Sequence, residues 1–322
     1  MPRLPALMHM IRLCATLATV AGVAGCALTT DEGGTKSSPR PMPRAAVPVA
    51  PPEPSAASLA VKAHFNQVQA DLLARGLLRR DGGGPDTPFS ERQLVENFVR
   101  IGLYDEYVSE GGRLVARQSP AALRRWDGPV RISVRFGAQV PEDQRTRDRA
   151  SVSAFADRLA RVSGHSIRVS DANPNYFVYI LSEDERSASA GEWAGLFPGL
   201  NRLELDIAAQ LPLSTFCLVL AISEGDRPVY SNALAVIRSE LPDLLRLSCI
   251  HEEIAQGLGL ANDHPQARPS IFNDDEEFAT LTRHDELLLK MLYDARLTPG
   301  MREAEARPIL RVLATEILGG ES

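Results

Sequence analysis

The sequence predicts an α+β domain in which a twisted mixed sheet lies over one long helix, preceded by a small helical segment. Residues 129–136 alternate apolar and polar side chains with period two, as a strand does, and residues 142–162 follow with the period of a long helix. Two further apolar runs, 216–222 and 229–237, are joined by Ser-Glu-Gly-Asp-Arg-Pro, which predicts a hairpin. A helix over 241–258 follows at once. A strand that leads into a helix and a separate hairpin together predict a mixed sheet.

The segment before this domain is expected to be helical. Residues 55–79 carry apolar side chains at helical spacing, and Ser90 before 91–103 is a helix-capping residue. A shorter helix is expected near 120–126, so that 58–126 form the helical N-terminal segment. The apolar side of the first helix is predicted to consist of Leu59, Val61, Phe65, Val68, Leu72, Leu73 and Leu77.

The rest of the chain completes the domain. Short apolar runs near 167–169 and 176–181 predict two more strands, and the polar, glycine-containing insertion that follows, to about Leu211, is expected to be irregular. A last helix is expected over 281–293. The predicted organisation is then 127–300 for the α+β domain and 301–322 for a C-terminal helix or tail.

The N-terminus has the pattern of an export signal. Arg3 and Arg12 precede an apolar run that is shorter than the roughly 20 residues of a spanning helix and ends in Val-Ala-Gly-Cys26. This resembles the bacterial lipobox and predicts a lipoprotein signal peptide over 1–25, with Cys26 as the acylated first residue. The alternatives are an ordinary signal peptide cleaved nearby and a start at Met8 or Met10.

Residues 26–57 are rich in Pro and Ala and cannot bury enough apolar surface to order themselves, so we expect an extended tether. Ala27 after the acylated cysteine resembles lipoproteins that are sent to the outer membrane. The predicted location is therefore the bacterial envelope, anchored in the outer membrane by lipid on Cys26 and facing the periplasm. The formal net charge of −6, without a basic stripe, gives no indication of a nucleic-acid partner.

An exported chain is in a compartment that permits disulfides. Once the signal peptide and the lipidated cysteine are set aside, Cys217 and Cys249 remain, and we expect them to be bonded; two buried free thiols are the alternative. Closing this loop stabilises the fold by roughly 3 to 4 kcal/mol in the chain-entropy model.

The segment 252–262 reads Glu-Glu-Ile-Ala-Gln-Gly-Leu-Gly-Leu-Ala-Asn and resembles the zinc helix and glycine turn of metzincin-type metalloproteases. In that family zinc binds to two His one helical turn apart and to a third after the turn, and a Glu beside the first is the general base. The ligand positions fall here on Glu252, Gln256 and Asn262. The base falls on Glu253 and the turn on Gly259.

The metzincin resemblance implies a zincin-like domain over 127–300, in which a twisted sheet lies over this helix. Residues 270–273 stand where metzincins turn beneath the metal, and 281–293 resemble their final helix. A closer resemblance is to the domain of unknown function family 2927, a family of exported bacterial proteins and lipoproteins, and it implies no activity. The residues that carry it are Trp126, Pro129, Cys249, 252–263, 270–274, His284, Asp285 and 291–294.

One carboxylate and two amides do not suit zinc, and with Asp263 the set suits Ca²⁺ or Mg²⁺ better. No cofactor is therefore expected. The alternative is a divalent metal, Zn²⁺ or Ca²⁺, held by Glu252, Gln256 and His264, or by Glu252 with His264 and His284. A further hypothesis is that these residues form only a solvated polar face of the helix.

A glycosidase-type carboxylate pair remains open as well. It would join Glu252 or Glu253 to Asp274 or Asp275, and the sequence does not give the distance between them.

The functional hypothesis is a non-catalytic, zincin-like envelope lipoprotein whose former active-site cleft binds a peptide or an envelope protein. The cleft residues would be Glu252, Gln256, Asn262 and Asp263. The alternative is a metal-dependent peptidase with Glu253 as general base. A purely structural envelope protein is the third possibility.

Overall fold

The computed structural model describes residues 51–319 except 111–112 and 274, and it leaves out the side chains of 106–116. The predicted signal peptide, Cys26 and most of the tether lie outside the described residues. Within the described part of the chain, every helix is too short or too polar to cross a bilayer.

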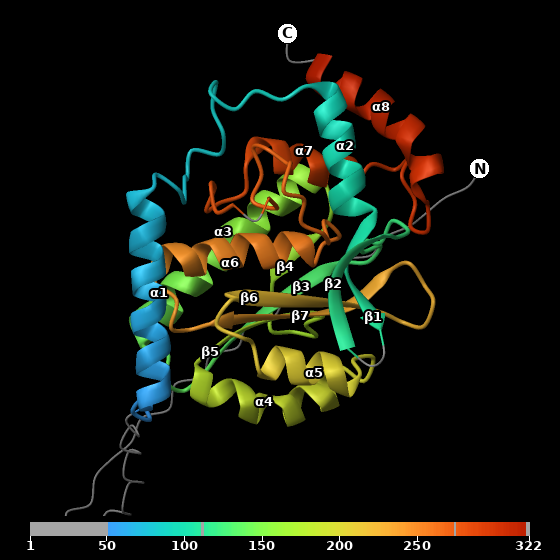
Figure 1. Ribbon diagram of the computed structural model, residues 1–322. Coiled ribbons are helices and arrows are strands. Elements are labelled where there is room, and N and C mark those ends of the chain that lie inside the picture. The colour runs from blue at the N-terminus through green and yellow to red at the C-terminus, as the bar shows by residue number, and fades with distance from the viewer. Residues whose placement is uncertain (1–50, 111–112, 274, 320–322) are drawn as a thin grey trace, which may run out of the picture. The chain divides into compact units, whose positions relative to one another are not determined.

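The described residues form an α+β fold with eight helices and seven strands (Figure 1). The helices are α1 (Ala56–Ala74), α2 (Glu91–Gly102), α3 (Glu142–Ser163), α4 (Glu183–Leu196), α5 (Arg202–Ala209), α6 (Asp243–Gln256), α7 (Arg283–Leu292) and α8 (Glu303–Gly319). The strands are β1 (Tyr104–Glu110), β2 (Arg113–Pro120), β3 (Val130–Phe136), β4 (Ile167–Val169), β5 (Tyr176–Leu181), β6 (Cys217–Ser223) and β7 (Tyr230–Arg238).

The main sheet has five strands in the order β4-β3-β5-β7-β6. The neighbours β4, β3, β5 and β7 are parallel, and only β6 runs antiparallel, as the first strand of the hairpin with β7. The prediction of a mixed sheet is therefore confirmed, and β6 is one of the two edge strands.

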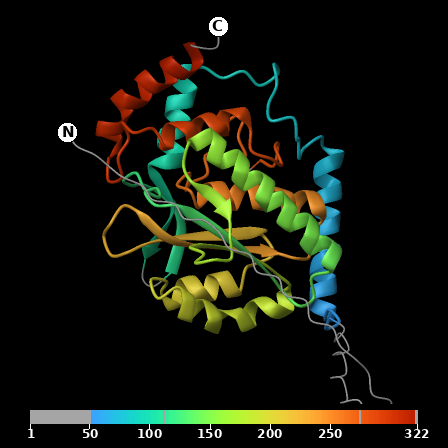
Figure 2. The same ribbon diagram turned by 180° about the vertical axis from the view of Figure 1, so that it is seen from behind.

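Helices cover both faces of this sheet: α3 and α6 lie on one face, and α4 and α5 lie on the other (Figures 1 and 2). All six residues of β5 are buried, as expected for a central strand of a sheet covered on both faces. Tyr176, Val178 and Ile180 belong to the core beneath α3 and α6, and the alternate side chains belong to the core beneath α4 and α5.

α6 is the helix that carries the predicted motif. It begins after Pro242, whose fixed backbone angle suits a helix start, and it packs against β6 and β7. Arg246 on α6 donates from Nε to both oxygens of Asp148 on α3, at 2.9 and 2.8 Å, and both side chains are buried. This ion pair fixes α6 beside α3.

Three expectations about local structure were wrong. The region around 120–126 is not a helix, because β1 and β2 form an antiparallel hairpin that ends at Pro120. The insertion after β5 is not irregular, because it holds α4 and α5, each with a complete capping box at Ser182 or Asn201.

The third wrong expectation concerns α1. Leu59 and Leu73 are about half exposed, so the buried side of α1 is narrower than its apolar pattern predicts.

Candidate functional site

The C-terminal end of α6 is held by three aromatic side chains from other elements. The Tyr176 hydroxyl on β5 donates to Glu253 O at 2.6 Å, and Trp126 Nε1–H donates to Gly257 O at 2.9 Å. The Tyr293 hydroxyl, after α7, donates to Leu258 O at 2.9 Å. Burial raises the pKa of Tyr176 well above its usual value, so this hydroxyl remains a donor. The carbonyls that end the helix are thus fixed in position.

The predicted glycine turn is present at Gly259, where φ is +124°. A Cβ at this position would lie 2.4 Å from Arg124 O, and one at Gly257 would lie 2.1 Å from the Tyr176 hydroxyl. The chain can therefore leave α6 in this direction only with glycine at both positions.

The acidic pair of the motif lies next to the first residue of β6. One carboxylate oxygen each from Glu252 and Glu253 and Sγ of Cys217 lie within 4.8 Å of one another. Glu253 is 4% exposed and Glu252 is half-buried. The acidic residues of α6 therefore lie beside the first residue of β6, at the edge of the sheet. The interpretation of this helix face as merely solvated is wrong for Glu253, because its side chain is buried.

The two amides of the motif hold the loop after α6. Gln256 Nε2 donates to Asp263 Oδ1 at 3.0 Å. Asn262 donates from Nδ2 to Arg100 O at 2.7 Å and from its backbone N–H to Ile101 O at 3.1 Å. Gln256, Asn262 and Asp263 are all buried, so the two amides fasten α6 and its loop to each other and to α2.

The two histidines considered as metal ligands, His264 and His284, lie outside the cluster formed by Cys217, Glu252 and Glu253. His284 is fully buried, with Nε2 3.0 Å from Asn97 Nδ2 and its ring edge-on to Phe89. His264 is half-buried, and burial lowers its pKa. Among the described residues, the cluster of possible ligand atoms at Glu252 includes neither histidine.

The residues at the metzincin ligand positions do not fit zinc. Gln256 and Asn262 supply amides that already hold the loop, and the Cys217 sulfur within 4.8 Å of Glu252 is in a disulfide, which carries no thiolate charge. Of the two candidate partners in a glycosidase pair, Asp274 lies outside the described residues and Asp275 is exposed.

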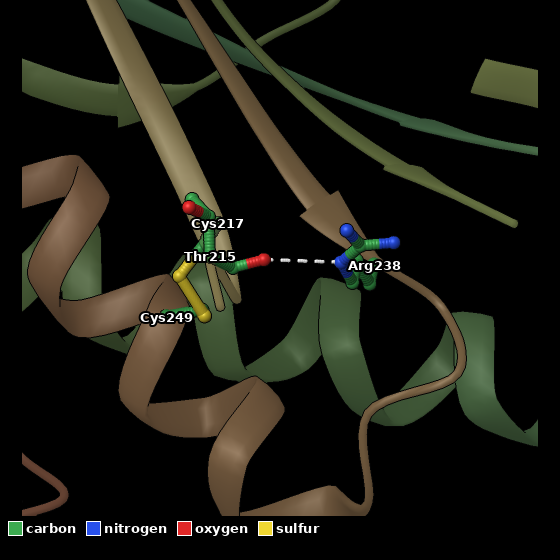
Figure 3. Close-up of a disulfide and its surroundings, with 4 residues drawn as sticks. All are labelled: Thr215, Cys217, Arg238 and Cys249. Atoms are coloured by element: carbon green, nitrogen blue, oxygen red, sulfur yellow. Dashed lines mark hydrogen bonds between the residues drawn. A yellow bond between two sulfur atoms is a disulfide. The ribbon is translucent and has the colours of Figure 1, made fainter. Parts of the chain in front are cut away.

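The predicted disulfide is confirmed. It joins Cys217 at the start of β6 to Cys249 on α6, with Cα atoms 5.9 Å apart (Figure 3). Next to it, the buried Arg238 at the end of β7 donates from Nε to Thr215 O at 3.1 Å. The edge of the sheet is therefore tied to α6 one helical turn before the acidic pair.

Two supporting side chains were missed by sequence reasoning. Asp285 on α7 accepts hydrogen bonds from the Ser270 hydroxyl at 2.6 Å and from Ile271 N–H at 3.1 Å, so it fixes the turn at 270–273. His251 stacks on Phe155 with ring centroids 3.9 Å apart, and burial lowers its pKa to about 3. Asp285 was noted only among the residues of the family resemblance, and the sequence did not indicate that His251 packs against Phe155.

The outer edge of β6 is defined by the direction of its main-chain groups. In a strand, the N–H and C=O of one residue point to the same side, and successive residues alternate. Ala233 N–H donates to Asn175 O, next to β5. The main-chain N–H and C=O of Leu234 therefore point the other way, toward Leu220 of β6. The β6 residues whose N–H and C=O turn away from the sheet are therefore Cys217, Val219 and Ala221.

Fold and site together define a mixed α+β domain with a glycine turn after α6, a disulfide-tied edge strand and two carboxylates beside it. The family described as Protein of unknown function (DUF2927) matches residues 91–312, and the chain belongs to this family. No curated protein and no solved structure matches the chain.

Proposed function

We propose that the protein is a bacterial envelope lipoprotein whose zincin-like domain binds an extended peptide segment of a partner protein along the outer edge of β6, without catalysis. The observation that carries this proposal is the edge itself. β6 is the last strand of its sheet, and the main-chain groups of Val219 and Ala221 point away from β7.

The composition of β6 supports strand addition. Its sequence, Cys-Leu-Val-Leu-Ala-Ile-Ser, has no charged residue and no proline, the usual devices by which proteins block an edge strand. Residues 218–221, whose side chains alternate between the two faces of the sheet, are half-buried. An apolar, unblocked edge is what peptide-binding domains offer for β-augmentation, in which main-chain hydrogen bonds give affinity and side-chain contacts give specificity.

The edge strand β6 begins next to the candidate site. Cys217, the first residue of β6, lies within 4.8 Å of the carboxylates of Glu252 and Glu253. A strand added along β6 therefore extends toward these acids, where a former active-site cleft is expected. The sheet over α6 and the turn at Gly259 are in keeping with a zincin-like ancestor, and the amides in place of imidazoles favour binding over hydrolysis.

The envelope location rests on the lipobox-like Val-Ala-Gly-Cys26 and on the proline-rich tether that follows it. The Cys217–Cys249 disulfide agrees with an oxidising compartment. A lipid on Cys26 would hold the domain near a membrane, within reach of other envelope proteins.

The test is selection from a random peptide library displayed on phage, with the disulfide-bonded full chain as bait. Ala221→Pro removes an outward N–H and keeps the ladder to β7, so it should weaken the selected peptides by at least roughly tenfold, which corresponds to about 1.4 kcal/mol. Ala221→Ser keeps the N–H and serves as the matched control.

Failure to select any peptide, or peptides that bind the proline variant equally well, overturns the proposal. The competing hypothesis of a metal-dependent peptidase makes a different prediction. In that case the disulfide-bonded protein would contain stoichiometric metal and cleave peptides, and Glu253→Gln would abolish cleavage with little change in melting temperature.

A further inference from the structure

We propose that α1 is a dimerisation helix, along which two copies of this chain pack antiparallel to each other through an apolar seam. The seam lies on the exposed side of α1 and consists of Ala56, Leu59, Ala63, Asn66, Ala70 and Leu73. The proposal goes beyond peptide binding at β6 and does not depend on it.

The inward side of α1 is already occupied by the domain. Four side chains of this helix are buried there, those of Ser58, Val61, Phe65 and Leu72. The Phe65 ring packs edge-on against Phe216, with ring centroids 5.4 Å apart. These four residues recur at the spacing of one helix face, so the domain covers this face and leaves the opposite one.

The outward side of α1 is apolar as well, and the described part of the chain leaves it open. Leu59 is 54% exposed and Leu73 is 48% exposed. Figures 1 and 2 show α1 at the margin of the domain. A helix on the surface of a globular protein normally has one apolar face and one polar face, so the second apolar face of α1 indicates a partner.

The seam is complementary to itself, which favours a second copy of the chain as that partner. Its residues recur at alternating spacings of three and four, the pattern of a coiled-coil seam. Asn66 lies at the centre, with Leu59 seven residues before it and Leu73 seven residues after it. A two-fold axis at Asn66 therefore brings each Leu59 to Leu73 of the second copy and the two Asn66 amides to each other, which fixes the register.

The charges of α1 fit the antiparallel direction. Only Lys62 and Asp71 carry a formal charge in this helix, four residues before and five residues after Asn66. An antiparallel copy places each Lys62 level with the other copy's Asp71, whereas a parallel copy places like charges level with each other. Charge complementarity thus selects the antiparallel pair.

The length of α1 sets the strength of the dimer. Its 19 residues span about 28 Å, so the contact is at the small end of specific interfaces, which bury about 1,200–2,000 Å². Because α1 is already folded against its domain, association does not have to form the helix. We expect a weak dimer, with a dissociation constant on the order of 10 μM. A lipid on Cys26 would confine two copies to one membrane and raise their effective concentration.

Sedimentation velocity of the unacylated full chain, over a concentration series that reaches the high micromolar range, should show a monomer–dimer equilibrium. Leu59→Lys with Leu73→Lys puts like charges into the seam and should weaken the dimer by at least roughly tenfold, without unfolding the chain, because both side chains are exposed. Leu196→Lys with Leu213→Lys changes two similarly exposed leucines outside α1 and is the matched control. A chain that stays monomeric over the series, or a dimer that survives the substitutions in α1, overturns the proposal.

Cysteine cross-linking tests the direction of the two helices. Every chain carries Cys14→Ser and Cys26→Ser, and oxidised glutathione is the oxidant. A chain with Leu59→Cys mixed with a chain with Leu73→Cys should give the mixed disulfide-linked dimer, whereas His64→Cys, exposed on α1 but off the seam, should stay uncross-linked. Cross-linking of the Leu59→Cys chain to itself in preference to the Leu73→Cys chain would overturn the antiparallel arrangement.

Discussion

Gly259 is the position where the turn after α6 depends most on a single residue. Its φ of +124° lies in a region that L-residues rarely adopt, and a Cβ would lie 2.4 Å from Arg124 O. Because Arg124 O belongs to the backbone, it cannot move aside as the end of a flexible side chain can. Gly259→Ala therefore combines backbone strain with a collision.

The magnitude follows from comparison with two other glycines. Gly164 has φ of +69° with nothing within 4 Å of its Cβ position, so Gly164→Ala carries only the left-handed strain of about 1–2 kcal/mol. Gly191 lies inside α4 in open space, and Gly191→Ala should stabilise by about 0.5–1 kcal/mol. Gly259→Ala adds an overpacking cost of about 1–3 kcal/mol to a backbone strain of about 1–3 kcal/mol, giving roughly 2–6 kcal/mol of destabilisation.

Urea unfolding monitored by far-UV circular dichroism measures all three variants under one condition. The expected order of stability is Gly191→Ala above the native chain, then Gly164→Ala, then Gly259→Ala. If Gly259→Ala costs no more than Gly164→Ala, the loop after α6 does not pass Arg124 as closely as described, and the reasoning is refuted.

Three further perturbations test the surroundings of the site. Replacing Cys217 and Cys249 together by serine should cost about 3.7 kcal/mol in metal-free urea unfolding, from the sequence separation of 32 residues; a loss below 1 kcal/mol would argue against the chain-entropy estimate. Asp148→Ala removes the buried carboxylate partner of Arg246, which keeps only the exposed Asp243, and should cost about 3–5 kcal/mol in thermal unfolding, whereas an unchanged melting temperature would mean that the Asp148–Arg246 pair is not buried. His251 has its pKa lowered to about 3 in the fold, so the unfolded chain binds the extra proton and stability should fall as pH drops from about 6.5 toward 3; His251→Leu should flatten that slope, and an equal slope in both proteins would contradict it.

The main sheet and the helices α3 and α6 on one of its faces were predictable because their local signals agree with the tertiary structure. The period-two pattern of β3 and the helical period of α3 each match one buried face. The Cys217–Cys249 bond was predicted because these two cysteines remain when those of the expected signal peptide and lipid anchor are set aside. These elements are the ones that determine where the site lies.

The β1–β2 hairpin was missed although its sequence carries a signal. The runs Tyr-Asp-Glu-Tyr-Val and Arg-Leu-Val-Ala-Arg flank a Gly-Gly pair, which is a hairpin pattern that the expectation of a helical N-terminal segment obscured. The helices α4 and α5 were missed for a related reason, since their polar and glycine content hid two capping boxes.

The burial of the candidate site was not predictable from one helix. The pattern of α6 indicates its core faces, but it does not reveal which elements cover its polar side. Glu253 and Gln256 are buried because β6 and the loop that holds Asp263 pack against them, and both approach from distant or irregular parts of the chain.

The edge of β6 is tested most directly by amide hydrogen exchange of residues 217–223 in the free protein and with a saturating selected peptide. Val219 and Ala221 should exchange faster than Leu218 and Leu220 in the free protein, and the peptide should slow these two amides the most. Peptide binding that leaves the exchange of Val219 and Ala221 unchanged would contradict strand addition at this edge.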